Sequence, residues 1–354
     1  MDRRIIGGKG RTLAAKLPRD PAAAPLPAVK SVTAATPQVL HLQVDEDSAG
    51  QRLDNFLMRH LKGVPKTHVY RVIRSGEVRI NKGRASADTR LQTGDDVRVP
   101  PVRVAERPAA AAAPAREFAV LFEDDALLAI DKPPGVAVHG GSGVSFGVIE
   151  QLRRARPAAR FLELVHRLDR ETSGVLLLAK KRSALTALQD QFRARDTGKT
   201  YAALVLGDWP ASLKVIDVPL HKYLKADGER RVRTSTADDA MAKRSITLVK
   251  VVQRFAGFTL LDVSIKTGRT HQIRVHLAHA GHPIVGDDKY GDFDFNKSLA
   301  RGGALPGQRY DGMFLHARRL AFDHPASGER IELQAPLPAA CTVLLQQLER
   351  HLRA

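Results

Sequence analysis

The 354-residue chain has one cysteine and no long apolar run. The lone Cys341 excludes an intrachain disulfide and a cysteine-rich zinc site. No stretch approaches the roughly 18 apolar residues of a membrane-spanning helix. The N-terminus carries arginine and alanine but no apolar segment before a cleavage site, so it lacks the pattern of a secretory signal. We therefore expect a cytoplasmic protein, with an organellar transit peptide as the alternative that this Arg- and Ala-rich opening leaves open.

Acidic residues are outnumbered: 38 Asp and Glu stand against 56 Lys and Arg, which leaves a net charge of +18. An excess of this size favours a polyanion, either nucleic acid or an anionic membrane surface. The basic residues recur along the whole chain and do not form one amphipathic helix, so we expect nucleic acid. The apolar fraction of 43% is ordinary for a globular protein, and the length favours two domains.

Composition divides the chain into four segments. Residues 1–38 are rich in Ala, Pro, Gly, Lys and Arg, and we expect a disordered basic tail. A second Ala/Pro stretch at residues 104–116 predicts an interdomain linker. A small domain at residues 39–103 and a large domain at residues 117–354 would then flank this linker.

The small domain shows helical spacing followed by strand alternation. A first helix is predicted by an apolar stripe that comprises Leu53, Phe56, Leu57 and Leu61. The segment "VPKTHVYRVIRSG" predicts a second helix, which begins near Pro65 and ends at Gly76. The segments "EVRINKGR" and "LQTGDDVRVP" then predict a small hairpin.

Basic side chains lie off the apolar stripes of both helices. We expect them to form one RNA-binding face, which comprises Arg52, Arg59, Lys66, Arg71 and Arg74. A solvated helix surface is the alternative. Residues 50 to 100 resemble the S4 RNA-binding domain, and "RLDNFL", "VYRVIRSGEVRINKGR" and "TGDDVRVP" carry the resemblance.

The large domain mixes strand-like and helical segments. Strand patterns include "LLAIDK", "VLLLAK", "TYAALVLG" and "RSITLVKVVQRFAGFTLLDVSIKTG", and helical patterns include "SALTALQDQFRARD" and "HQIRVHLAHAG". Helices separate only some of the strands, and turns separate the others. This order predicts an α+β fold with a mainly antiparallel mixed sheet and flanking helices, not a doubly wound one.

Three motifs fail on their context. "DTGKT" lacks the first glycine of a P-loop, because Arg193 stands at that position. "GVSFG" matches a nucleophile elbow around Ser145, but no strong strand precedes it, so a turn that caps the next helix is the favoured reading. A group of histidines lacks a zinc-ligand pattern and comprises His271, His276, His279 and His282. We therefore expect no metal site.

Two polar turns remain as a candidate site. In "HRLDRETSGVLLLAK" an apolar run brings Asp169 to a turn, and residues 172–174 are expected to reverse the chain. A nearby guanidinium would favour the ionised carboxylate, which suits a nucleophile or base. In "IKTGRTHQIRVHLAHAGHPIVGDDKYG" a strand ends and basic residues enter a helix, an arrangement suited to phosphate. Together the two turns predict a site with one carboxylate, several arginines and no metal.

These motifs occur in an order that resembles the RluA family of pseudouridine synthases. "LLAIDKPPGVAVHGG", "KTYAALV" and "MFLHARRLAF" complete the resemblance, which covers roughly residues 40 to 340. It implies isomerisation of uridine in RNA to pseudouridine without a cofactor or metal. The substrate would be several uridines of large-subunit (23S) ribosomal RNA, and we expect the protein to be a monomer.

The resemblance also implies catalytic roles. Asp169 matches the catalytic aspartate, which either attacks the ribose C1′ or abstracts the 2′ proton. Arg274 matches the arginine that pairs with this aspartate. Tyr201 matches the tyrosine that stacks on the uracil and helps move the C5 proton.

Four further positions match substrate contacts. Arg167 corresponds to the arginine that fills the stack left by the flipped base. Ile273 and Leu315 correspond to apolar residues that enclose the uracil ring. Lys199, next to the tyrosine motif, is expected to contact phosphate. Two other classes stay open: a non-enzymatic S4-type RNA-binding protein, and a serine hydrolase at Ser145.

Overall fold

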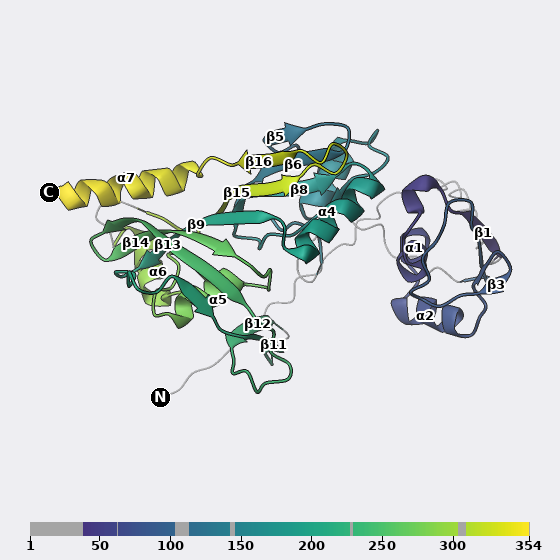
Figure 1. Cartoon of the computed structure of the whole chain (residues 1–354), viewed down its shortest axis with the longest axis horizontal. Coiled ribbons are helices and arrows are strands. Elements are labelled where there is room, and N and C mark those ends of the chain that lie inside the picture. Colours follow the sequence, from purple (N-terminus) through teal and green to yellow (C-terminus); the bar gives the residue numbers. More distant parts are fainter. Residues whose placement is uncertain are drawn as a thin grey trace, which may run out of the picture.

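The computed structural model describes residues 38–61, 63–102, 113–141, 146–226, 229–303 and 309–353. They form a small folded unit, which carries the labels β1, α1, α2 and β3 in Figure 1, and a large one. The expected tail, most of the expected linker and Ser145 lie outside the described residues. In the described part of the chain, no helix has the length and apolarity needed to cross a bilayer.

The small unit packs two helices on a four-stranded sheet. The helices are α1 (Leu53–His60) and α2 (Lys66–Arg74), as the apolar spacing predicts. The sheet has the order β1-β4-β2-β3 and consists of β1 (Leu40–Gln43), β2 (Arg79–Ile80), β3 (Gly83–Arg84) and β4 (Asp96–Val99). Strand β1 was not predicted, because this edge strand is mostly exposed and shows no alternation of buried and exposed residues.

The large unit is built on one ten-stranded sheet. Its main order is β10-β13-β14-β9-β15-β8-β6-β5, with β16 beside β15 and β7 beside β8. All pairs are antiparallel except β15 with β8, which confirms the predicted mainly antiparallel mixed sheet. The strands are β5 (Val120–Glu123), β6 (Leu127–Lys132), β7 (Glu163–Leu164), β8 (Ser173–Ala179), β9 (Gly198–Leu206), β10 (Val215–Asp217), β13 (Ile246–Phe255), β14 (Phe258–Ile265), β15 (Leu315–Asp323) and β16 (Arg330–Gln334).

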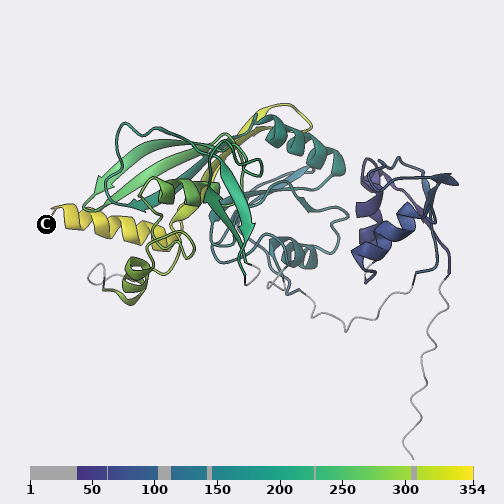
Figure 2. The same cartoon turned by 90° about the horizontal axis from the view of Figure 1, so that it is seen from below.

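Among the described residues, five helices and a separate hairpin flank this sheet, and Figure 2 shows them from below. The helices are α3 (Val148–Ala155), α4 (Arg182–Ala194), α5 (Gln272–His279), α6 (Phe293–Arg301) and α7 (Ala339–Arg353). The hairpin consists of β11 (Leu220–Leu224) and β12 (Arg230–Thr234). Neither α6 nor the hairpin was predicted, because each buries too few side chains to produce a periodic pattern; in α6 only Leu299 is buried.

Strand β8 lies in the middle of the core and is buried along its whole length. Its side chains alternate between two apolar clusters: Leu177 packs with residues of α4, and Leu176 packs with residues of α3. Burial on both faces explains the continuous apolar run in the sequence. The segment just before β8 is thereby attached to a strand that is buried along its whole length.

The chain reversal before β8 lies earlier than the sequence predicts. Ser173 and Gly174 are already part of β8, and the turn closes where the Thr172 amide donates to the Asp169 carbonyl, at 3.2 Å. Gly174 has φ +106°, and a Cβ there would lie 2.3 Å from the carbonyl oxygen of Ala317. Only glycine therefore permits the close approach of β8 and β15, which fixes the start of the strand behind Asp169.

Candidate active site

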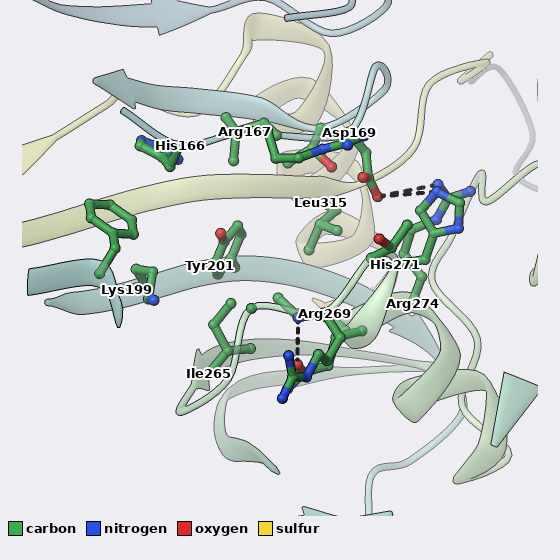
Figure 3. A pocket seen from close by; sticks show the side chains of 17 residues that line it. His166, Arg167, Asp169, Lys199, Tyr201, Ile265, Arg269, His271, Arg274 and Leu315 are labelled. Atoms are coloured by element: carbon green, nitrogen blue, oxygen red, sulfur yellow. Dashed lines mark hydrogen bonds and ion pairs between the residues drawn. The ribbon is translucent and has the colours of Figure 1, made fainter. Parts of the chain in front are cut away.

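One cavity of about 240 Å³ collects every catalytic and substrate-binding residue that the sequence predicts. Its walls come from the loop before β8, from β9, from the start of α5 and from the first residue of β15 (Figure 3). The predicted residues in its lining are Asp169, Tyr201, Arg274, Arg167, Ile273, Leu315 and Lys199. Segments far apart in the sequence thus converge on one site.

Asp169 is the carboxylate of this cavity. Its Oδ2 lies 3.5 Å from Nη1 of Arg274 and 3.9 Å from Nε2 of His271. Both neighbours come from the start of α5, and Figure 3 shows them on the same side of the carboxylate. The guanidinium and the imidazole thus face the same carboxylate oxygen from one element.

Arg274 is buried, and its strongest partner is not Asp169. Its Nε and Nη2 donate to the two carboxylate oxygens of Asp287 at 2.7 and 2.6 Å, and Nη2 also donates to Asp288 at 2.9 Å. Burial alone would lower the pKa of Arg274, but the hydrogen bonds and the charge of Asp287 raise it above its ordinary value. The predicted pair with Asp169 therefore exists as a longer contact of an arginine that Asp287 already holds in place.

His271 connects Asp169 to the β11–β12 hairpin. The amide of Val232 donates to the Tyr290 hydroxyl at 3.1 Å, and that hydroxyl lies 2.8 Å from Nδ1 of His271. Burial lowers the pKa of His271, which favours the neutral ring. If the Tyr290 hydroxyl donates to Nδ1, each polar atom of this hydrogen-bonded series has a partner, and the Nε2–H of His271 faces Asp169.

The sequence reasoning assigned no role to Asp287, Tyr290 or His271. The signal was present, because "GDDKYG" belongs to one of the motifs that carry the family resemblance. Its two aspartates are separated from Arg274 by a helix and a turn, and a pairing across that distance does not follow from periodicity. The sequence places His271 in a basic turn suited to phosphate and in a group of histidines without a zinc-ligand pattern, and neither observation predicts its contact with Asp169.

The middle of the cavity is apolar. Tyr201 on β9, Ile273 on α5 and Leu315 on β15 belong to one apolar cluster. Burial raises the pKa of Tyr201, and the negative charge of Asp169 raises it further, so the phenol stays protonated at neutral pH. These three side chains form a slot suited to a flat ring.

The arginines on either side of Asp169 differ in their surroundings. Arg167 is exposed at the cavity and has no side-chain hydrogen bond or ion pair among the residues that the structure describes. Arg170 is also exposed, but its Nε contacts the carboxylate of Glu171 at 2.6 Å. Arg167 is therefore available to a ligand, whereas Arg170 already has a partner.

The predicted RNA-binding side chains lie on the two helices of the small unit. Arg59, Lys66, Arg71 and Arg74 are exposed. Arg52 instead forms a two-point contact with the buried carboxylate of Asp54, at 3.1 and 2.8 Å. We therefore separate Arg52 from the four exposed cations of this face.

The weaker motifs have structural explanations where the structure describes them. Gly198, Lys199 and Thr200 of the P-loop-like segment form extended strand β9, which cannot wrap a phosphate. His276 is buried and contacts Thr247 at 2.8 Å. His276 is therefore explained as a core side chain with a hydrogen-bond partner.

Comparison with known proteins identifies both folded units. The family model "RNA pseudouridylate synthase" matches residues 126–279, and the "S4 domain" model matches residues 51–97. "Ribosomal large subunit pseudouridine synthase C" of Escherichia coli K12 is 51% identical over 319 residues, which are 88% of this chain and 98% of the relative. The chain belongs to the RluA family of RNA pseudouridine synthases. The protein of the same name from Haemophilus influenzae is 51% identical over 87% of this chain and 94% of its own length.

Solved structures agree with this family assignment. Human RNA Pseudouridylate Synthase Domain Containing 4 has a TM-score of 0.53 and 29% identity over 65% of this chain and 93% of its own. The match to the pseudouridine synthase model includes Asp169, Tyr201 and Arg274, and the S4 match includes the whole basic helical face. The predicted fold class and enzyme class are confirmed.

Proposed function

We propose that this pseudouridine synthase isomerises several uridines of large-subunit ribosomal RNA. The names of its relatives in Escherichia coli and Haemophilus influenzae support this substrate, and the net charge of +18 suits it. The observation that carries the proposal is the cavity itself: one carboxylate, Asp169, lies beside a fixed guanidinium and an apolar slot. A non-enzymatic RNA-binding protein would have no need for this arrangement.

The reaction breaks the N1–C1′ bond, turns the uracil and forms a C5–C1′ bond, while C5 loses a proton and N1 gains one. The target uridine first leaves the RNA stack to enter the cavity. Asp169 then acts on the ribose, either by attack on C1′ or by removal of the 2′ proton, and both routes need its ionised form. Arg274, held by Asp287, keeps its positive charge beside Asp169 without leaving its own position.

The remaining cavity residues would bind the flipped nucleoside. Tyr201 stacks on the uracil and takes part in the movement of the C5 proton, and Ile273 and Leu315 enclose the ring. A flat apolar slot lets the detached base turn while it excludes water. Arg167, exposed at the cavity, fills the space that the base leaves in the RNA stack.

The small unit would supply affinity through the exposed cations of α1 and α2. We propose the domain boundaries 39–103 and 117–354, with the segment between them as a tether. A tether lets one catalytic domain reach several uridines while the small domain stays bound. The protein would act as a cytoplasmic monomer, and the chemistry assigned to its residues needs no cofactor.

Mapping of pseudouridine in large-subunit ribosomal RNA tests the proposal. RNA from a strain that lacks this chain should retain uridine at the positions the enzyme modifies, and the wild-type gene should restore pseudouridine there. An unchanged map would favour the RNA-binding alternative. Labelling by a fluorophosphonate probe would instead favour a serine hydrolase, whose predicted Ser145 lies outside the described residues.

A further inference from the structure

The cavity has a second polar end that the proposed roles leave unexplained. Figure 3 shows His166 and Lys199 at one end of it, and Asp169, His271 and Arg274 at the other. Tyr201 lies between the two ends. A ligand that fills the slot and reaches Asp169 with one side therefore presents its opposite side to His166 and Lys199.

Lys199 brings a half-buried ammonium group to this end. Nζ lies 5.1 Å from the centre of the Phe192 ring, and Lys199 has no ion pair or hydrogen bond among the described residues. Burial lowers the pKa of Lys199, and the positive charge of Arg195 lowers it further. The contact with Phe192 holds the group in position, and its donors remain free for a ligand.

His166 lies at the same end of the cavity as Lys199. Its Nε2 accepts a hydrogen bond from the amide of Leu177 at 3.1 Å. Burial lowers the pKa of His166 to about 4, so the ring is neutral at physiological pH. A neutral imidazole whose Nε2 accepts must carry its proton on Nδ1. That Nδ1–H is already paired with the backbone of Arg167, so His166 presents a neutral ring to the cavity and no free donor.

The geometry of β9 relates the Lys199 ammonium to a bound base. Lys199 and Tyr201 are two residues apart on one strand, so their side chains leave the same face about 6.6 Å from each other. A uracil that stacks on Tyr201 and is joined through N1 to a ribose at Asp169 directs the atom opposite N1 towards Lys199. That atom is C4, which carries the acceptor O4.

We propose that Lys199, beside the neutral ring of His166, forms a uracil-recognition site and hydrogen-bonds the exocyclic oxygen O4 of the flipped base. This inference rests on the proposed function and replaces the phosphate contact that the sequence position of Lys199 predicts. Cytosine carries an amino group at the same position, and the ammonium donor of Lys199 would then face a donor. The site therefore selects uracil among the pyrimidines.

The same site fits the base after it has turned. The turn exchanges N1 with C5 and C4 with C2, so O2 of the product takes the place of O4. In between, the N1–C1′ bond has broken with its electron pair on the ring, and the negative charge spreads over the two carbonyl oxygens. Hydrogen bonds to a charged acceptor are the stronger ones. The recognition site should therefore stabilise the detached base more than the substrate and raise kcat.

The test combines an enzyme variant with an altered base. Large-subunit ribosomal RNA is transcribed once with uridine and once with 4-thiouridine, whose sulfur is the weaker acceptor, and single-turnover rates are measured. Lys199→Met should lower the rate on the uridine transcript by about ten- to a hundredfold, the range for a hydrogen bond to a charged group. The ratio of the rates on the uridine and 4-thiouridine transcripts should also be smaller for Lys199→Met than for the wild-type enzyme.

Two controls keep the interpretation specific. Lys199→Arg retains a donor and should keep most of the rate, and Lys250→Met, an exposed lysine of β13, should change nothing. Effects of sulfur on RNA folding cancel, because both enzymes receive the same transcripts.

Two results would overturn the inference. In the first, Lys199→Met leaves kcat unchanged but reduces the dependence of log affinity on log salt by about one, as the loss of a phosphate contact does. In the second, wild-type and Lys199→Met enzymes lose the same factor on 4-thiouridine. If wild-type enzyme forms no pseudouridine in the unsubstituted transcript, the proposed function itself is wrong.

Discussion

Lys132→Met tests how the loop that carries Asp169 is held in place. Lys132 is the last residue of β6, and its side chain is fully buried. Its ammonium donates to the carbonyl oxygens of Pro133 and Val136, each at 2.8 Å, and to that of Arg170 at 3.0 Å. Because Arg170 directly follows Asp169, this lysine ties the catalytic loop to the sheet. Methionine keeps the length of the side chain and removes all three donors.

The expected loss of stability is the difference between two opposing contributions. Three buried carbonyl oxygens without donors cost about 1–3 kcal/mol each, or roughly 6 kcal/mol together. Burial lowers the pKa of the ammonium to about 7, because the charged form is destabilised in the protein interior. Methionine carries no charge and removes this destabilisation. At about 1.4 kcal/mol per pH unit this relief amounts to roughly 4 kcal/mol at neutral pH. We therefore expect a net loss of about 2 kcal/mol in the free energy of unfolding.

The assay has two readouts, urea unfolding and single-turnover pseudouridine formation. A loop displaced by about 1 Å should lower kcat roughly a hundredfold with little change in RNA affinity. Lys180→Met is the matched control: this lysine follows β8, is partly exposed, and pairs with Glu123 at 2.8 Å, so we expect a change below about 1 kcal/mol. A Lys132→Met enzyme with wild-type kcat would refute the positioning argument.

The pH dependence of the same variant gives an independent check. The pKa of Lys132 in the folded state, about 7, lies below its ordinary value of 10.5, so the unfolded state binds more protons between these values. Stability of the wild-type protein should therefore rise with pH in this window, by up to about 1.4 kcal/mol per unit relative to Lys132→Met. Below pH 7, Lys132 is protonated in both the folded and the unfolded protein. The difference in stability between the wild-type protein and Lys132→Met then no longer changes with pH. Urea unfolding of both proteins at pH 7 and pH 9 measures it.

Two further predictions concern the parts that surround the site. Gly174→Ala should cost at least about 3 kcal/mol by thermal unfolding, because its methyl group would lie 2.3 Å from the Ala317 carbonyl oxygen. The control Gly328→Ala, also at positive φ but in open space, should cost about 1 kcal/mol. Equal losses of stability in the two variants would contradict the close approach of β8 and β15. Asp287→Asn should cost about 3–5 kcal/mol in urea unfolding, because Arg274 would keep a buried charge without its main partner. A stable Asp287→Asn protein would show that Asp169 and Asp288 suffice to hold this arginine.

The elements that the sequence predicts are those with a periodic buried face. Leu53, Phe56 and Leu57 place α1 on the core of the small unit, and the unbroken apolar run of β8 follows from burial on both faces. The β11–β12 hairpin could not be predicted in this way, because only Leu220 and Val232 contribute to its small buried cluster. An element with few buried side chains has a sequence pattern that cannot be distinguished from that of a loop.

At the site, the family motifs predicted the residues, and the structure adds how they are held. Asp169, Tyr201 and Arg274 line one cavity, as expected. Their supports depend on contacts between distant segments, such as Asp287 with Arg274, which spacing does not specify. Lys132 is the clearest example, because a lysine in "LLAIDKPPG" gives no sign that it is fully buried.

Asp169→Asn is the most direct test of the account. Asparagine keeps the shape of the side chain but has no negative charge, so neither attack on C1′ nor removal of the 2′ proton can proceed. We predict that RNA labelled with tritium at C5 of uridine releases no tritium above background, while RNA affinity stays within about twofold of wild type, since the basic helical face is untouched. Asp190→Asn, an exposed carboxylate of α4, serves as the control with full release. Tritium release by Asp169→Asn at the wild-type rate would contradict the central role of this carboxylate.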